Sequence, residues 1–271
     1  MLPLSLLLLL TMAPFSGPDL SLQNQLRQEY VGSQRMLRHF SAADKLTFDD
    51  AGEPLNEEQN VSWTLGGAVA IENLRVQGKK LELQGRRRMV TFDHQNKQLV
   101  FKKWDKKVWI EVGTNDGPDQ DHQLRKALAK VFVESADLPD LLPEYWRDYM
   151  RRFLGRQSGG CETEPVEGGA TSGGSQPAAL ASDGVAPGNL IKKAAPYYLP
   201  AARKAGVPGD VELHAFITTN GTVRDICLVK ALGAGLDDSG IDAVRQWQYK
   251  PYLLDGHPVE VDTTIKITFR K

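Results

Sequence analysis

Histidines are the residues in which a metal centre or an acid–base site would first be recognised. The chain has five of them: His39, His94, His122, His214 and His257. Histidines that bind zinc usually recur about three to five residues apart, and no two of these lie that close together. We expect His94 and His257 at turns and His122 at a helix start, and each of the five is more often a surface residue than a ligand. We expect no metal site and no cofactor.

Two other kinds of catalytic motif are missing from the sequence. It has no G-x-S-x-G nucleophile elbow and no phosphate-binding loop. The segment LGAGLDDSG, residues 232–240, is rich in glycine, but no Lys-Ser/Thr pair follows it. Its glycines and acidic residues predict a sharp turn that leads into a helix. We therefore expect no enzyme, although an enzyme or small-ligand carrier in the N-terminal part stays open as an alternative.

The cysteine content allows one disulfide. Cys161 and Cys227 are the two cysteines of the chain, and they could pair if the protein is exported to an oxidising compartment. The alternative is two free thiols.

The charge balance gives no sign of nucleic-acid binding. The chain of 271 residues has a formal net charge of -1, with acidic and basic residues well mixed. Its basic clusters are Arg86–Arg88, Lys102–Lys103 and Lys106–Lys107. We expect them at or beside strand turns, where charged side chains are solvated and protect sheet edges.

The N-terminus is apolar from Leu2 to Phe15. A helix needs about 20 residues to cross a bilayer, so this segment fits the apolar core of a signal peptide better than a membrane span. It has no basic residue before Arg27 and no clean cleavage site. We predict a signal peptide or short apolar segment over residues 1–17 and a periplasmic or cell-envelope location. A buried strand or helix is the alternative.

Composition divides the rest of the chain into two domains. Residues 155–188 are rich in Gly, Ser, Ala and Pro, which predicts a disordered linker. Before it, residues 18–154 show short alternating apolar runs such as Val90/Phe92 and Leu99/Phe101, separated by polar turns. Two amphipathic segments close this part. We expect an α+β domain of unknown role, made of an antiparallel β-meander with a helical cap.

Residues 189–271 predict a ββαβ domain. Apolar residues alternate from Val211 to Ile217 and again from Val259 to Phe269, and Asn220-Gly221 is a strong hairpin signal. Between the hairpin and the last strand, Ile241, Val244 and Trp247 predict a helix that Pro251 ends. The Asp255-Gly256 pair then predicts a turn. The three expected strands leave two open sheet edges.

Several motifs of this domain occur together in one order. They are YLPAARKAG at residues 198–206, GDV at 209–211, NGTV at 220–223, LGAGLD at 232–237, AVRQWQYKP at 243–251 and DGHPV at 255–259. Over about 75 residues this combination resembles the C-terminal domain of TonB-family energy transducers. The resemblance implies a structural role for a set of motif residues, namely Gly209, Gly221, Gly235, Trp247, Pro251 and Gly256.

The same resemblance implies how the domain works. The family's domain lies in the periplasm and binds an extended segment of outer-membrane receptors by adding it as a strand. The contact region of the family matches Tyr198, Leu199, Pro200 and Arg203, with Tyr-Leu-Pro in place of the family's Tyr-Pro. Residues of the last strand, Thr264, Lys266 and Thr268, are further candidate contacts. Their alternative role is ordinary sheet core and solvated face.

The implied partners are TonB-dependent outer-membrane receptors or other envelope proteins. An inner-membrane proton-channel complex and a homodimer are further partners that the resemblance allows. We therefore expect a periplasmic binding module linked to TonB-dependent transport. The alternative is a true energy transducer that keeps its N-terminus. The sequence lacks the long proline-rich rod and the membrane helix of such transducers.

Overall fold

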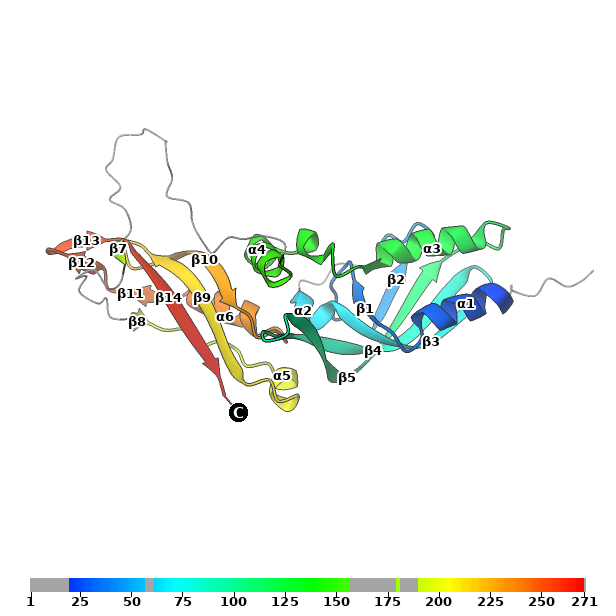
Figure 1. Ribbon diagram of the computed structural model, residues 1–271, viewed down its shortest axis with the longest axis horizontal. Helices are drawn as coiled ribbons and strands as arrows, with labels where there is room; N and C mark the ends of the chain where they lie inside the picture. The colour runs from blue at the N-terminus through cyan, green and yellow to red at the C-terminus, as the bar shows by residue number, and fades with distance from the viewer. Residues whose placement is uncertain (1–19, 57–60, 156–178, 181–189, 271) are drawn as a thin grey trace, which may run out of the picture.

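The computed structural model describes residues 20–56, 61–155, 179–180 and 190–270. The predicted export segment, Cys161 and most of the predicted linker lie outside this part of the chain. The described residues form an elongated molecule with one sheet toward each end (Figure 1). Among its helices, none combines the length and apolarity needed to cross a bilayer.

The larger sheet has the strand order β2-β5-β4-β3-β1-β6. Its strands are β1 (Gln34–Leu37), β2 (Lys45–Phe48), β3 (Ala68–Gln77), β4 (Lys80–Asp93), β5 (Gln98–Gly113) and β6 (Phe132–Val133). The three long strands are antiparallel neighbours in chain order, as in a meander. The prediction of a purely antiparallel sheet is wrong at one edge, because β2 pairs with β5 in parallel. The chain crosses from β1 to the far edge before it forms β2, and such short strands leave little trace in the sequence.

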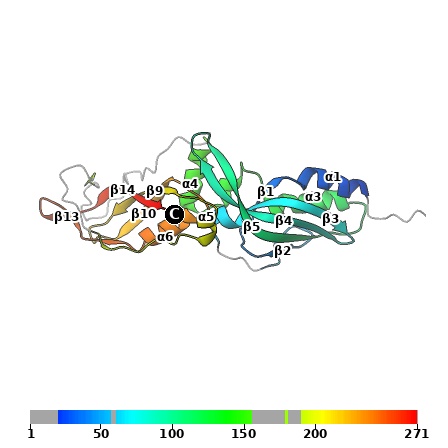
Figure 2. The same ribbon diagram turned by 90° about the horizontal axis from the view of Figure 1, so that it is seen from below.

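Two helices, α1 (Leu20–Tyr30) and α3 (Gln120–Val131), lie on one face of this sheet (Figures 1 and 2). On α3 the buried residues are Leu124, Ala127, Leu128 and Val131, which is the amphipathic spacing of a helix packed by one side. They form a core with apolar residues of the long strands. The remaining elements of this part are α2 (Trp63–Gly66), the 3-10 helix η1 (Leu138–Leu141) and α4 (Glu144–Phe153).

The basic clusters do not lie at turns as predicted: Lys102–Lys103 and Lys106–Lys107 lie inside β5. Residues 86–88 lie inside β4 rather than at a turn, and Arg87 is completely buried. Its guanidinium donates to the carbonyl oxygens of Gly66 at 2.9 Å and Ala43 at 2.7 Å. Burial lowers the pKa of Arg87 to about 10. This arginine joins strand β4 to the end of α2 and to the loop before β2, because strand alternation turns its side chain inward.

The smaller sheet has the order β10-β9-β14-β7. Its strands are β7 (Ala179–Leu180), β9 (Gly209–Ile217), β10 (Val223–Lys230) and β14 (Val261–Phe269). The other elements are β8 (Leu190–Lys192), α5 (Pro200–Lys204), α6 (Leu236–Val244), β11 (Gln248–Tyr249), β12 (Tyr252–Leu254) and β13 (His257–Val259). The predicted apolar rows of β9 and β14 are buried, among them Val211, Leu213, Ile265 and Ile267.

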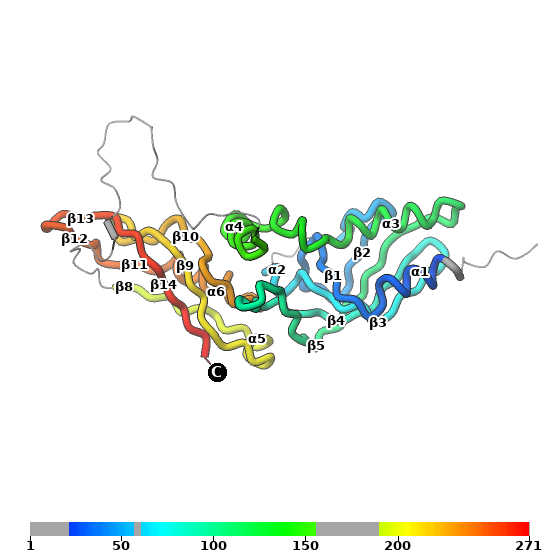
Figure 3. Tube along the Cα trace, in the orientation of Figure 1, coloured from blue at the N-terminus to red at the C-terminus, as the bar shows by residue number. Residues whose placement is uncertain are grey.

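Helix α6 ends earlier than the proline predicts. It stops at Val244, and Gln248–Tyr249 form β11, which pairs with β8 (Figure 3). The prediction of a helix that runs to Pro251 is therefore wrong. Backbone pairing with a strand far back in the sequence takes the place of the last helical turns, and single-sequence periodicity contains no information on that partner.

The predicted turns at Asn220-Gly221 and Asp255-Gly256 are both present, and their backbone conformations differ from each other. Asp255 and Gly256 both have positive φ, 51° and 81°, and they join β12 to β13 as a two-residue hairpin turn. In the β9–β10 turn only Gly221 has positive φ, at 78°. The Gly221 carbonyl accepts the N–H of Tyr249 at 2.8 Å, so this turn also holds β11.

An aromatic cluster joins the two parts of the molecule. Trp146 of α4 is fully buried and contacts the rings of Trp63 at 5.1 Å and Phe92 at 5.7 Å. The same continuous core includes residues of β9, β10, α6 and β14. Figure 3 shows α4 beside β10, between the two sheets. The N-terminal part therefore packs against the C-terminal sheet over an apolar surface.

Several polar contacts between the two parts involve the loop 232–238, by which we mean residues 232–235 together with the first residues of α6. Its Ala234 N–H donates to the carbonyl of Val90 at 2.8 Å, and the Gly235 N–H donates to the Thr64 hydroxyl at 2.8 Å. Asp238 Oδ1 accepts bonds at 2.9 Å from the Tyr145 hydroxyl and from the Trp146 indole. The loop is thus fixed by backbone and side-chain bonds to residues far away in the sequence.

Candidate functional site

The outer side of β14 is the feature that best fits a binding role. All nine residues of β14 pair with β9 on one side. On the other side β7 pairs only with Val261 and Asp262. Within the described chain, residues 263–269 therefore have no strand on that side (Figure 1). Backbone N–H and C=O groups along such an edge can accept another extended segment. We call residues 263–269 the β14 rim.

Polar side chains follow one face of the β14 rim. Thr264, Lys266 and Thr268 are exposed. The Lys266 ammonium lies 2.9 Å from the Asp210 carboxylate, which also accepts a hydrogen bond from the Thr268 hydroxyl at 2.6 Å. These bonds lower the pKa of Asp210, and the bond to Asp210 raises that of Lys266. Exposed pairs of this kind contribute little stability, so these side chains remain available to a ligand.

Tyr198 and Arg203 lie at the C-terminal end of β14. The Tyr198 ring is 5.4 Å from that of Phe269, and its hydroxyl donates to the Val207 carbonyl at 2.9 Å. The Arg203 guanidinium lies 4.9 Å from the centre of the Tyr198 ring. Pro200 begins α5 and is exposed.

Leu199 lies apart from the rim residues. It is half-buried and packs against the core that joins the two parts. The structure thus brings Tyr198 and Arg203 to the end of the β14 rim, whereas Leu199, like Leu65 of the N-terminal part, lies against Gly235.

The opposite edge of the sheet is partly covered. The Arg152 guanidinium of α4 donates to the carbonyl of Leu228 in β10 at 2.7 Å. Contacts of this kind occupy acceptors that an added strand would need. Arg152 therefore occupies one acceptor of β10, and β7 pairs with the first two residues of β14, so each of the two predicted open edges is partly occupied.

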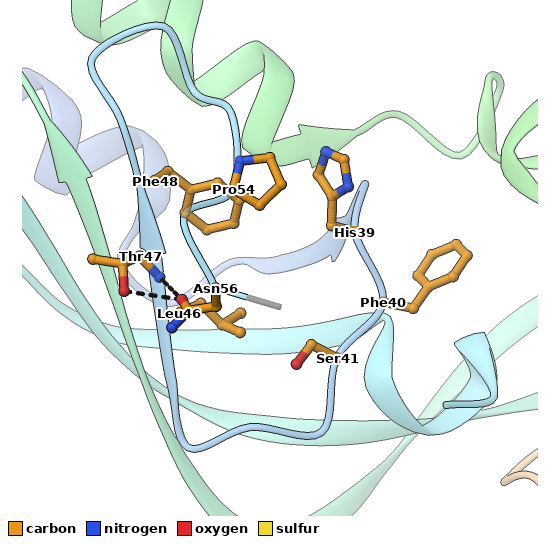
Figure 4. A pocket seen from close by; sticks show the side chains of 8 residues that line it. All are labelled: His39, Phe40, Ser41, Leu46, Thr47, Phe48, Pro54 and Asn56. Atoms are coloured by element: carbon orange, nitrogen blue, oxygen red, sulfur yellow. Dashed lines mark hydrogen bonds between the residues drawn. The ribbon is translucent and has the colours of Figure 1, made fainter. Parts of the chain in front are cut away.

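The histidines occupy unrelated positions. His94 bonds the Ala231 carbonyl at 2.7 Å, His214 pairs with Asp262 at 2.6 Å, and His122 and His257 are exposed. His39 lines a small pocket between β2 and its neighbouring loops (Figure 4). Among the described residues, no group of three or more His, Cys, Asp or Glu side chains could hold a metal ion.

The pocket offers few free polar groups. Its walls are mostly apolar, with Phe40, Leu46, Phe48 and Pro54. Figure 4 shows Thr47 and Asn56 bonded to each other, and the Asn56 oxygen accepts the Thr47 hydroxyl at 2.9 Å.

The C-terminal sheet matches a known protein family. The family model described as Gram-negative bacterial TonB protein C-terminal matches residues 194–270. These residues form a TonB-family C-terminal domain. We refer to them as the TonB-like domain.

Curated relatives agree with this assignment. "Protein TonB" of Vibrio cholerae is 34% identical over 76 residues, which are 28% of this chain and 31% of that protein. "Protein TonB" of Xanthomonas campestris is 31% identical over 75 residues, which are 27% of this chain and 34% of that protein. The chain spans about a third of the length of these relatives.

A solved structure of the same kind of domain is also similar. The solution structure of the Pseudomonas aeruginosa TonB C-terminal domain has 20% sequence identity and a TM-score of 0.28, and the match covers 35% of this chain and 96% of that one. The assignment rests on the sequence matches, because a superposition of this quality adds nothing to them.

The residues with an expected structural role lie at turns and in the core of the TonB-like domain. Trp247 is 7% exposed, and its indole N–H donates to the Ala194 carbonyl at 2.8 Å. Pro251 is an exposed residue between β11 and β12. The glycines of the set all have positive φ: Gly209 at 153°, Gly221 at 78°, Gly235 at 73° and Gly256 at 81°.

Cys227 of β10 is disulfide-bonded. The only other cysteine of the chain is Cys161, which lies outside the described residues. The predicted pairing of these two cysteines stays a prediction.

The loop contacts of the TonB-like domain were missed at the sequence level. Residues 232–238 predict a turn with a capped helix start, but α6 begins without a side-chain cap. Asp237 instead accepts the backbone N–H groups of Leu232 at 2.7 Å and Gly233 at 2.6 Å. The pair Asp237-Asp238 after the glycine-rich loop could have indicated these contacts. One carboxylate can accept the N–H groups of the loop, while the other accepts hydrogen bonds from a neighbouring element.

Asp237 should make the stability of the protein depend on pH. Burial raises its pKa to about 8, the Asp238 carboxylate adds to this, and the two backbone bonds oppose it. The Asp237 carboxyl group therefore stays protonated in the folded chain at pH values above 3.8, at which it loses its proton in the unfolded chain. The free energy of unfolding should therefore fall as pH rises from 3.8 to about 8, by at most about 1.4 kcal/mol per pH unit.

Urea unfolding at a series of pH values measures this effect. An Asp237→Asn variant carries no charge at this position and should lose most of the slope between pH 5 and 8. A wild-type free energy of unfolding that rises across this window would contradict the expectation.

Proposed function

We propose that the TonB-like domain binds an extended segment of an envelope protein, such as a TonB-dependent outer-membrane receptor, by accepting it as an added strand. The β14 rim is the observation that supports this proposal, since its backbone groups face no strand in the described chain. Backbone bonds would supply affinity, and neighbouring side chains would select the segment.

Side chains at the rim define what kind of segment would fit. Lys266 and Arg203 are cations, and Asp210 is an anion beside Lys266. The Tyr198 ring offers an apolar surface next to Phe269. A segment with an apolar residue near the end of β14 and polar residues along the Thr264–Thr268 face would be complementary. The proposed location is the periplasm or cell envelope, and the proposed activity is binding rather than catalysis.

A proline scan of β14 tests strand addition. In an antiparallel pair, successive N–H groups of one strand point alternately to the partner and to the opposite side. Proline at Thr264 and proline at Ile265 therefore remove N–H groups on opposite sides of β14. One of these variants should lose stability, while the other should stay folded and bind about tenfold less tightly.

The binding probe is a fluorescein-labelled peptide with the sequence of the extended segment of a TonB-dependent receptor from the same genome. Its binding to the full chain is measured by fluorescence anisotropy. The same peptide with N-methylated alternate amides is the control, since it keeps the side chains but lacks backbone donors. Equal binding of both peptides, or of wild type and the folded proline variant, would overturn the proposal.

A further inference from the structure

Strand β7 occupies the beginning of the same edge that the proposed function uses. Its residues Ala179 and Leu180 pair in parallel with Val261 and Asp262. β7 belongs to the long connection between α4, which ends at Phe153, and β8, which begins at Leu190. The protein therefore places a segment of its own chain where an added strand would continue.

We propose that β7 competes with the partner segment for β14, so that the protein limits its own strand addition. This inference rests on the proposed function of the β14 rim. The contact is made by the backbone, because strand pairing needs only N–H and C=O groups and not particular side chains. A foreign strand that extends to Val261 and Asp262 thus requires the same backbone atoms as β7.

Covalent attachment makes this competition effective. Because β7 and β14 belong to the same chain, β7 has a local concentration on the order of millimolar near β14. A partner segment at a concentration below this value displaces β7 only if it binds β14 more tightly than β7 does. The two residue pairs of β7 are few, and each backbone hydrogen bond contributes only about 0.5–1.5 kcal/mol. β7 therefore sets a threshold for binding instead of closing the edge permanently.

The geometry also predicts which partners are affected. Nine residues of β14 minus the two that β7 pairs leave seven open residues, 263–269. A partner segment that pairs only with these seven meets no competitor. A segment that runs in the same direction as β7 and extends further toward its own N-terminus reaches Val261 and has to displace β7. Sensitivity to β7 should therefore increase with the length of the partner segment.

The test compares two double variants of the full chain. Ala179→Pro with Leu180→Pro removes both N–H donors of β7, whereas Ala179→Ser with Leu180→Ala keeps them and serves as the matched control. The probes are two labelled receptor peptides, one of seven residues and one extended by four residues at its N-terminus. If β7 is paired in half to nine-tenths of the molecules, the proline variant should bind the longer peptide about two- to tenfold more tightly. Binding of the shorter peptide should not change.

A second measurement separates this inference from the proposed function. Hydrogen exchange at the amides of residues 261–263 should be faster in the proline variant than in the serine–alanine control, with no peptide present. If no variant binds either peptide while exchange still differs, the proposed function fails and the β7 pairing stands. If both variants bind the longer peptide equally and exchange at the same rate, β7 is no competitor and the inference is overturned.

Discussion

Replacing Gly233 by alanine is expected to destabilise the protein by about 2–5 kcal/mol. The residue has a φ of 86°, and a Cβ atom there would lie 2.2 Å from the carbonyl oxygen of Val90 and 2.7 Å from the Cα of Thr91. Both neighbouring atoms belong to the backbone of β4, so they cannot move aside as a flexible side chain would. The substitution should separate the loop 232–238 from the N-terminal part.

Gly256 provides the matched control for this variant. Its φ is 81°, close to that of Gly233, but no heavy atom lies within 4 Å of the Cβ position. A Gly256→Ala change should therefore cost only the left-handed conformation, about 1–2 kcal/mol. Urea unfolding of both variants measures the difference. Equal free energies of unfolding would show that the close approach to β4 is absent in solution.

Replacing Trp146 by alanine is the second change with a large expected effect. The side chain is fully buried, packs against Trp63 and Phe92, and donates its indole N–H to Asp238 at 2.9 Å. Truncation of a buried tryptophan costs about 3–5 kcal/mol, because it removes apolar burial and leaves a cavity. The substitution should destabilise both the N-terminal part and the TonB-like domain, because the Trp146 ring lies in the core that they share.

Trp109 is the control for Trp146, because its side chain is 43% exposed on β5. Trp109→Ala should change the free energy of unfolding by less than about 1 kcal/mol. Trp146→Phe keeps an aromatic ring but removes the indole N–H, so its cost should fall between the two alanine variants. A Trp146→Ala variant as stable as Trp109→Ala would exclude a structural role for the aromatic cluster.

Sequence patterns of a few neighbouring residues predicted correctly the features of the fold that depend on those residues alone. Alternation placed the buried faces of β9 and β14, and the Asp255-Gly256 pair predicted a hairpin turn that has two positive φ values. The motif order of the C-terminal part indicated the TonB resemblance, which the family model supports over residues 194–270. Each of these signals depends on residues close together in the chain.

The errors concern contacts between segments far apart in the chain. The end of α6 depends on pairing of β11 with β8, and the covering of β10 depends on Arg152 of α4. Arg87 was expected in solvent, but its burial depends on carbonyls of Ala43 and Gly66. For the candidate site, the sequence indicated Tyr198 and the last strand, but it gave no sign that β7 would pair with β14.

The apolar contact between α4 and the C-terminal sheet determines whether one part of the protein can be produced without the other. A fragment cut at the start of the TonB-like domain would expose to water the buried residues Leu228, Ala234 and Leu236, which share a core with Trp146. Freshly exposed apolar surface of this kind favours aggregation. In this protein the two halves should therefore stay soluble together, whereas a fragment of either half should aggregate.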